Sequence, residues 1–308
     1  MAILGLILWQ TIIPLFVLIG IGVLFQKAFR PDIRTLSKLI FYVLTPVITF
    51  QKLYESELTM AVLGEILLFF CMFYVLLIIV AEAVIRIRGY KPSKRSAFRN
   101  SALFYNSANY GVPLNLLVFQ QSPVALSVQI MIMTIQNIIP NTYGVYSVNA
   151  HKQAWKETAK VILTIPTIYM IPLAFILRAG DVPIPASLYI PMNYISEGFI
   201  PVALITLGIQ LGSMKVKFQA LDVALSGCIR LLAAPVLGFL VVFMLGLEGI
   251  VAKALILSCA VPTSLSSVLL AIEFDNEKEF ASQTVLASTI LSIVTITVVV
   301  YLLRYIPG

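Results

Sequence analysis

Charged residues are scarce in this 308-residue sequence: they make up only 11% of it, whereas 60% of the residues are hydrophobic and the mean hydropathy is +0.98. A water-soluble domain needs more polar surface than this composition supplies, so the sequence predicts an integral membrane protein. Continuous apolar runs of about 20 residues, the length that crosses a hydrocarbon layer of about 30 Å, predict helices. A β-barrel would alternate apolar and polar residues instead.

Metal ligands and disulfide partners are also scarce. Cys71, Cys228 and Cys259 lie inside apolar runs without CxxC spacing, which favours buried packing over disulfides or zinc. The single histidine, His151, is expected in a solvated loop, and the acidic segment 273–279 offers too few alternating oxygen ligands for calcium. The net charge of +7 comes without a groove-reading motif, which argues against a nucleic-acid partner. No cofactor or metal is predicted.

Ten apolar runs are predicted as membrane spans. Their ranges are 4–26, 36–53, 62–86, 98–120, 125–148, 160–178, 191–212, 222–245, 251–272 and 283–304. Lys and Arg number 16 in one set of alternate loops and 4 in the other, with Arg230 left inside a span. Because cytoplasmic loops retain positive charge, both termini are expected to face outward from a cell membrane. The first apolar run is too long for the core of a signal peptide and is expected to be the first span.

Two pairs of motifs suggest that the chain repeats itself. The segment "ALFYNSANYGVPLNLLVF" around Pro113 matches "ALILSCAVPTSLSSVLLA" around Pro262, 149 residues later. Similarly, "TPVITF" around Pro46 matches "IPVALI" around Pro201, at an offset of 155. Self-similar halves are typical of secondary carriers. With five spans each, the halves 1–150 and 151–308 must enter the membrane from opposite sides, which makes them inverted repeats.

Glycine and proline predict that spans four and nine are broken. Pro113, with Gly111 beside it, and Pro262 remove backbone donors and favour irregular conformations. Such backbone is tolerated at membrane depth only where it is buried in protein or lines a watery cavity. Half-helices that begin near 111–114 and 262–264 would point their partially positive N-termini at a common crossing. This arrangement favours an anionic ligand.

Polar side chains without formal charge surround both breaks. Asn115, Ser258 and Ser266 lie near them, and a neutral polar lining suits a carboxylate. In span five, Gln136 is favoured as a site residue and Asn141 as a packing residue. The predicted substrate-binding residues are Asn106, Asn109, Gly111, Val112, Pro113, Gln136, Val261, Pro262, Thr263 and Ser264.

Ionisable residues inside the spans are few. Arg230 lies about ten residues into span eight and is expected to pair with carbonyls freed by a broken helix, as an anchor of the crossover. Snorkelling toward the cytoplasm is an equally structural explanation, and direct substrate contact is the alternative. The carboxylates Glu65, Glu82, Glu197 and Asp222 lie toward span ends, where interfacial solvation explains them. Uniport or exchange is therefore as compatible with the sequence as ion symport.

Taken in order and spacing, five motifs resemble the auxin efflux carrier family, which includes bacterial organic-acid carriers and the plant PIN-type auxin exporters. These motifs are "FYVLTPVITF", "NSANYGVPL", "ISEGFIPVALITLGIQLG", "IRLLAAPVLG" and "AVPTSLSSVLLAIEF". The resemblance covers nearly the whole chain. It implies ten helices in two inverted repeats, similar to bile acid and sodium/proton carriers, with spans four and nine crossing.

The resemblance also implies a mechanism. Spans one, two, six and seven would form a dimerising scaffold, while spans three to five and eight to ten would carry the substrate in an elevator-type movement. Asn106 occupies the place of an asparagine that binds the substrate carboxylate, and Gln136 that of a span-five glutamine. Tyr105 stands where the plant motif has proline, and the long loop of the plant exporters is absent. The compact form resembles bacterial relatives associated with malate or malonate.

The predicted function is transport of a small carboxylate such as malate, malonate or an auxin-like acid. Ion-coupled symport of another solute is the alternative, and a channel is less compatible with moving inverted repeats. An enzyme is disfavoured because the central spans offer serines and asparagines without a His, Asp or Glu partner.

Overall fold

The computed structural model describes residues 2–56, 58–144, 147, 163–214 and 220–308. These residues are helical apart from connecting segments and one isolated β-bridge. Six helical stretches in the described part are long and apolar enough to cross a membrane: Ile3–Phe29, Ile33–Glu55, Ala61–Arg88, Ala186–Gly212, Leu221–Leu245 and Lys278–Tyr305. An all-α membrane protein is thereby confirmed. Shorter helices occupy the other predicted spans, and ten crossings with inverted repeats stay a prediction.

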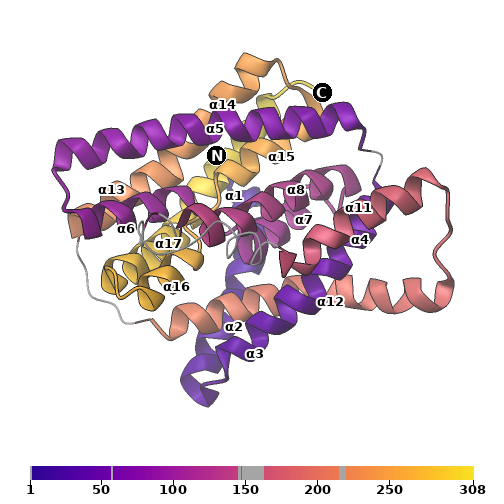
Figure 1. The fold of residues 1–308 in the computed structure, drawn as a ribbon, viewed down its shortest axis with the longest axis horizontal. Helices are drawn as coiled ribbons and strands as arrows, with labels where there is room; N and C mark the ends of the chain where they lie inside the picture. The colour runs from indigo at the N-terminus through magenta and orange to yellow at the C-terminus, as the bar shows by residue number, and fades with distance from the viewer. Residues whose placement is uncertain (1, 57, 145–146, 148–162, 215–219) are drawn as a thin grey trace.

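The long apolar stretches are built from several helical elements. In chain order these are α1 (Ala2–Ile7), η1 (Leu8–Ile12), α2 (Ile13–Phe29), α3 (Ile33–Leu39), η2 (Ile40–Leu44), α4 (Thr45–Glu55), α5 (Met60–Arg88), α6 (Pro92–Leu103), η3 (Ser107–Gly111), α7 (Val112–Val118), α8 (Pro123–Ile139), η4 (Pro140–Gly144), α11 (Pro166–Ala179), α12 (Ala186–Gly212), α13 (Ala220–Cys228), η5 (Ile229–Ala233), α14 (Ala234–Leu245), α15 (Gly249–Cys259), α16 (Ser266–Glu273), α17 (Lys278–Leu302) and η6 (Leu303–Tyr305). Figure 1 shows α5 along one side of the molecule and α2, α3 and α12 along the opposite side. Helices α6, α7, α15 and α16 lie between these sides.

Four prolines inside the spans are preceded by a π-turn, in which one residue is inserted relative to an α-helix, whereas Pro172, Pro191 and Pro201 lie within α-helices. In an α-helix, the proline ring clashes with the carbonyl four residues earlier. Here the residue before each proline donates instead to the carbonyl five residues before itself, which widens the turn. The four cases are Ile13 to Leu8 before Pro14, Thr45 to Ile40 before Pro46, Val112 to Ser107 before Pro113, and Ala234 to Ile229 before Pro235. The helices therefore pass through these prolines without ending.

Glycine allows α2 and α12 to approach very closely. A Cβ atom at Gly22 would lie 2.1 Å from the Ile205 carbonyl oxygen, and one at Gly208 would lie 2.0 Å from the Ile19 carbonyl oxygen. Small residues at such crossings let membrane helices pack backbone to backbone. Helix α4 packs against both α11 and α12. Helices α2, α4, α11 and α12 thus form one packed group, called here the first helix group.

The remaining helices pack around buried aromatic side chains. Phe73 and Phe104 are fully buried between α5 and the end of α6, and the rings of Phe98 and Phe280 stack with centroids 6.1 Å apart. Large buried rings remove much apolar surface from contact with lipid and fix the helices that carry them. This second helix group comprises α5, α6, α8 and α13–α17. It therefore includes α6, α15 and α16, which are parts of the two interrupted helices.

Candidate substrate-binding site

Two helices are interrupted, and their interruptions meet. The first helix stops at Leu103 and resumes at Ser107, while the second stops at Cys259 and resumes at Ser266. Residues Tyr105 and Thr263 in the two gaps form an antiparallel β-bridge. The Asn106 N–H donates to the Pro262 carbonyl at 2.9 Å, and the Ser264 N–H donates to the Phe104 carbonyl at 2.8 Å. The bridge therefore satisfies backbone groups that the interruptions leave without helical partners.

The interruption in the first helix lies earlier than the prolines suggested. Gly111, Val112 and Pro113 are helical, because the π-turn η3 accommodates the proline and the gap falls at residues 104–106. Pro262, by contrast, lies within its gap as expected. Gly111 has an ordinary helical φ of −65°. Its missing side chain serves close packing, since a Cβ atom there would lie 2.5 Å from the Gln129 amide nitrogen.

Arg230 ties the two stopping points together. Its guanidinium donates to the Ala102 carbonyl at 3.3 Å and also to the Cys259 carbonyl, and it lies 4.6 Å from the centre of the Tyr105 ring. The side chain is fully buried, so it does not snorkel. Both carbonyls belong to helix C-termini, whose partial negative charge a buried cation stabilises. The geometry is that of an anchor for the crossing.

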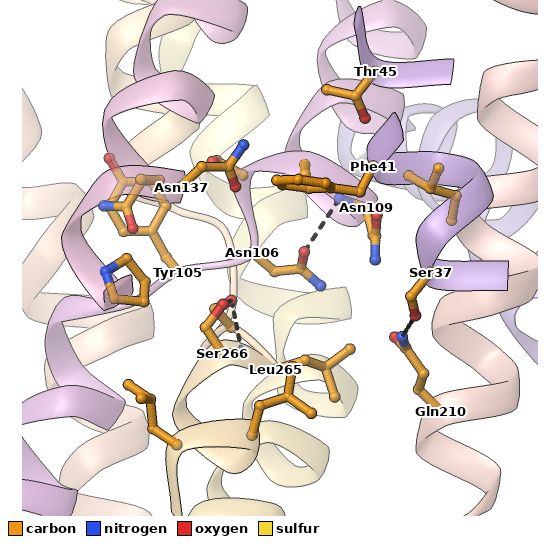
Figure 2. Close-up of a pocket in the computed structure, with 18 of the residues that line it drawn as sticks. Ser37, Phe41, Thr45, Tyr105, Asn106, Asn109, Asn137, Gln210, Leu265 and Ser266 are labelled. Carbon is orange, nitrogen blue, oxygen red and sulfur yellow. Dashed lines mark hydrogen bonds between the residues drawn. The ribbon is translucent and has the colours of Figure 1, made fainter. Parts of the chain in front are cut away.

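A cavity of about 480 Å³ opens beside the bridge. Four of the predicted site residues line it: Asn106, Asn109, Gln136 and Ser264. Figure 2 shows Asn106 and Tyr105 on one side of the cavity and the hydrogen-bonded pair of Ser37 and Gln210 on the other. The other lining residues are Lys38, Ile40, Phe41, Tyr42, Thr45, Ser107, Ala108, Asn137, Pro140, Leu265, Ser266, Leu269, Leu270 and Glu273.

The remaining predicted site residues do not line the cavity. Gly111, Val112 and Pro113 lie in the helix that follows Asn106, and Val261 and Pro262 are buried in the second gap. Thr263 donates to the Ser101 carbonyl at 3.0 Å, and its N–H donates to the Ser288 hydroxyl at 3.2 Å. Arg230 does not line the cavity either, since the Tyr105 ring lies against its guanidinium.

Asn106 is the most informative residue of the lining. Its side-chain oxygen accepts a hydrogen bond from the Asn109 N–H at 3.2 Å, which caps the helical segment beginning at Ser107. This bond fixes the amide so that the nitrogen is the remaining polar atom. The Asn106 Nδ2 group has no hydrogen-bond partner among the described residues, although the side chain is only 5% exposed. This buried donor therefore needs an acceptor that the described residues do not supply.

Gln129 was not predicted. It donates to the Ser107 carbonyl at 3.0 Å and accepts a hydrogen bond from Ser258, so it joins the restart of the first interrupted helix to the end of α15. Gln129 lies seven residues before Gln136, on the same face of α8. Two glutamines spaced by seven residues in an apolar span are the sequence signal that could have identified Gln129. The cavity wall formed by Ser37 and Gln210 carried no comparable signal.

A second cavity of about 890 Å³ adjoins the first. The two share the lining residues Ser37, Lys38, Gln210, Leu265 and Leu269. Basic side chains of Arg34, Lys38 and Lys278 also line the second cavity, and they belong to the loops and helix ends that are rich in Lys and Arg. The candidate site is thus continuous with a wider opening toward this end of the molecule.

The acidic residues have distinct surroundings. Glu82 pairs with Arg95 and Arg99, and Asp222 pairs with Arg88 and Lys94. Glu65 and Glu197 are exposed, and neither lines the cavities. Glu273, which begins the acidic segment 273–279, lines the candidate site.

The cysteines correct one prediction. Cys259 is buried, but Cys71 and Cys228 are exposed on apolar helices. The reason is that a helix face toward lipid is as apolar as a face toward protein, so hydrophobic context alone does not indicate burial. Among the described residues, no group of three His, Cys, Asp or Glu side chains could hold a metal ion. His151 and the Asn141 side chain lie outside the described residues.

Apolar helices around a central polar cavity define the class of helical membrane transport proteins. Residues 156–300 match the family described as membrane transport protein. The chain is 22% identical over 291 residues to an uncharacterized transporter of Methanothermobacter thermautotrophicus, covering 93% of this chain and 95% of that protein. Both matches are to membrane transport proteins, and they agree with the resemblance to the auxin efflux carrier family noted from the motifs.

Proposed function

We propose that this protein transports a small organic carboxylate, such as malate, malonate or an auxin-like acid, by alternating access around the 480 Å³ cavity. The observation that carries the proposal is the unpartnered Asn106 Nδ2 donor in the cavity wall. A carboxylate oxygen is the acceptor that such a donor binds most strongly, because charge-assisted hydrogen bonds are about twice as strong as neutral ones.

The helix ends support an anion as well. Ser107, Ala108 and Asn109, which begin the restarted first helix, line the cavity, and so do Ser264 and Ser266 at the start of α16. Helix N-termini carry partial positive charge and favour negative ligands. Both interrupted helices would therefore contribute to an anion site, as expected for two inverted repeats that cross at their breaks.

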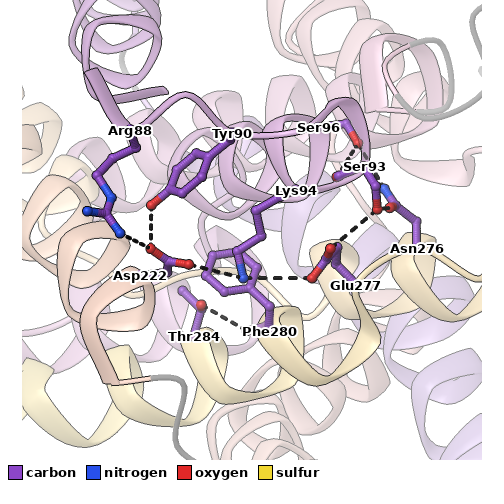
Figure 3. Close-up of polar contacts among 10 residues, drawn as sticks. All are labelled: Arg88, Tyr90, Ser93, Lys94, Ser96, Asp222, Asn276, Glu277, Phe280 and Thr284. Atoms are coloured by element: carbon purple, nitrogen blue, oxygen red, sulfur yellow. Dashed lines mark hydrogen bonds and ion pairs between the residues drawn. The ribbon is translucent and has the colours of Figure 1, made fainter. Parts of the chain in front are cut away.

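An elevator-type movement would need the second helix group to move as one body. Figure 3 shows a polar network that joins helices of this group to one another at one end. Asp222 of α13 accepts hydrogen bonds from Tyr90 at 2.6 Å and Arg88 at 3.4 Å. Lys94 of α6 lies 3.5 Å from Asp222 and 3.7 Å from Glu277. Burial and the bond to Asp222 raise the pKa of Tyr90 to about 12, so the phenol keeps its proton and donates.

The same network reaches α17 through two further contacts. The Lys94 ammonium lies 3.8 Å from the centre of the Phe280 ring, and Asn276 bridges Ser93 and Ser96 of α6. Helices α5, α6, α13 and α17 are thus joined to one another at one end. This supports residues of the second helix group as the moving part, with α2, α4, α11 and α12 as the scaffold. A homodimer through that scaffold is part of the proposal and follows from the family resemblance alone.

The adjoining 890 Å³ cavity supports an inward-open state. Its Lys- and Arg-rich end is the one that the distribution of positive charge assigns to the cytoplasm. The basic lining would attract an anion from that side. Both termini are then proposed to face outward.

The proposal is tested with Asn106→Asp in proteoliposomes. Aspartate keeps the oxygen that caps the Asn109 N–H but replaces the donor by a second acceptor. We expect uptake affinity for carboxylates to fall at least about 100-fold, because a charge-assisted bond worth about 1.5–3 kcal/mol is lost and a repulsion is added. Uptake of malate, malonate, succinate and indole-acetate is measured in parallel.

Asn193→Asp is the matched control. Asn193 accepts a hydrogen bond from Gln51 and lies outside both cavities, so the same substitution leaves that bond intact. Its uptake should equal that of the parent protein. Normal carboxylate uptake by Asn106→Asp would remove the anion site from this cavity.

An ion-coupled symporter is the second candidate, and Glu273 favours it. A carboxylate in the lining of the cavity could take up a proton or sodium ion together with the substrate. Glu273→Gln, assayed with and without imposed proton and sodium gradients, separates the two. Gradient-driven accumulation that disappears in this variant would indicate coupling, and gradient-independent exchange would indicate the uncoupled carrier.

A further inference from the structure

Gln136, like Asn106, is held in one orientation by its neighbours. Its amide nitrogen donates to the Tyr74 hydroxyl at 2.7 Å. That hydroxyl donates its only proton to the Leu103 carbonyl at 2.7 Å, so it can only accept from Gln136. The amide cannot be flipped without placing two acceptors against each other. The Gln136 side-chain oxygen is therefore the atom left over.

The leftover oxygen has no hydrogen-bond partner among the described residues, and the side chain is only 4% exposed. Gln210 also has an unpartnered oxygen, but its partner Ser37 can donate or accept, so the orientation of that amide is not fixed. The amides of Asn106 and Gln136 have fixed orientations because backbone groups set them. The Asn109 N–H does so for Asn106, and the Leu103 carbonyl does so for Gln136 through the Tyr74 hydroxyl. Both side chains line the same cavity, and each carries one buried polar atom without a described partner: a donor, Asn106 Nδ2, and an acceptor, Gln136 Oε1.

A carboxylate without a donor group can form a hydrogen bond with only one of these two amides. It accepts from Asn106 but offers Gln136 nothing except further acceptors. A buried acceptor that loses its water without gaining a donor weakens binding by about 5- to 150-fold. A ligand that carries a hydroxyl or N–H group beside its carboxylate satisfies both amides.

We propose that the site selects carboxylates that also carry a hydrogen-bond donor, with the carboxylate at Asn106 and the donor at Gln136. This rests on the proposed function, since it assumes a carboxylate in the cavity, and it narrows the substrate class to hydroxy-acids and acids with an N–H group. Sites built to hydrogen-bond a hydroxyl discriminate strongly against analogues without one. The cavity volume of about 480 Å³ is within the range of small-molecule sites.

The test uses matched ligands that differ by one hydroxyl: malate against succinate, and lactate against propionate. Binding to the purified full chain is measured by isothermal titration calorimetry. We expect the hydroxy-acid of each pair to bind about 10- to 100-fold more tightly. Gln136→Met removes the acceptor, so the preference should shrink to within about twofold, mainly because succinate, which no longer leaves a buried acceptor unsatisfied, binds more tightly than to the parent protein.

Tyr74→Phe tests the orientation without touching the cavity, because Tyr74 does not line it. Without the phenol oxygen, the Gln136 amide can turn and present its nitrogen, so the preference for the hydroxyl should fall several-fold. This variant also decides the matter if Gln136→Met does not fold. Tyr54→Phe is its control, since Tyr54 bonds the Val182 carbonyl at 2.8 Å and does not line the cavity, and it should change nothing.

The outcomes separate the two proposals. Equal binding of malate and succinate to the parent protein overturns the donor requirement while leaving a carboxylate carrier intact. A full hydroxyl preference in Gln136→Met or in Tyr74→Phe overturns the assignment to Gln136. Failure to bind any carboxylate overturns the proposed function and this inference with it.

Discussion

The helix interrupted at residues 104–106 and the helix interrupted at residues 260–265 share one β-bridge and one buried arginine, yet they restart in different ways. At the first restart, Asn106 caps the helix with its oxygen and leaves its nitrogen without a described partner. At the second, Ser264 accepts from the Ser266 N–H at 3.2 Å and Thr263 donates to Ser101. Polar groups of the second restart are thus satisfied within the protein.

The two similar motifs therefore differ in whether they leave a side-chain polar group without a partner. If Asn106 binds the ligand as proposed, the first interruption supplies the side-chain donor, and the second contributes the backbone groups that bond to it across the β-bridge. Sequence similarity between the halves therefore does not imply equal roles in binding. Stability and carboxylate affinity, measured separately on the same variants, test this difference between the two interruptions.

The largest effect is expected at Arg230, which both interruptions share. Arg230→Met leaves the Ala102 and Cys259 carbonyls without their donor, and each buried carbonyl costs about 1–3 kcal/mol. The free energy of unfolding in detergent should fall by about 2–6 kcal/mol. Arg304→Met, an exposed arginine near the C-terminus, is the control and should change it by less than about 0.5 kcal/mol. Equal stability of the two variants would contradict the anchor.

A smaller effect is expected at Gly111, behind the first interruption. Gly111→Ala forces Gln129 away from the Ser107 carbonyl and should destabilise by about 2–3 kcal/mol, as overpacking does. Carboxylate affinity should fall too, because Ser107 borders the cavity. Gly227→Ala is the control, since a Cβ atom there meets nothing within 4 Å. An affinity that stays constant would show that Gln129 does not position the first restart.

The smallest effect is expected behind the second interruption. Ser288→Ala removes the acceptor of the Thr263 N–H and should lower stability by about 1–2 kcal/mol. Carboxylate affinity should stay within about twofold, opposite to the pattern of Asn106→Asp. Ser187→Ala, at an exposed position of α12, should leave stability and affinity unchanged. A large loss of affinity in Ser288→Ala would mean that the second interruption also supplies hydrogen bonds to the ligand.

Much of the fold followed from the sequence because apolar runs and matched motifs are local signals. Asn106, Asn109 and Ser264 line the cavity since they lie within or beside a motif that interrupts a helix, and Gln136 lines it from the uninterrupted α8. The position of the first interruption could not be predicted, because a proline is compatible either with a gap or with a π-turn.

The far wall of the cavity could not be predicted for a different reason. Ser37 and Gln210 are separated by 173 residues and meet only because α3 and α12 pack together. Each looks alone like an ordinary polar residue near a span end. The fixed orientations of Asn106 and Gln136 also depend on partners that only the folded chain brings together, such as Tyr74 and the Leu103 carbonyl.

The π-turns before Pro14, Pro46, Pro113 and Pro235 have a practical consequence for anyone who reads this chain by helical periodicity. Each inserts one extra residue, which rotates the following helix by about 100° relative to an uninterrupted one. A helical wheel drawn straight through such a proline assigns the lipid-facing side of the second segment wrongly. Deleting a single residue within a π-turn would instead turn an entire downstream face toward different neighbours, so these turns set which side chains each helix presents beyond its proline.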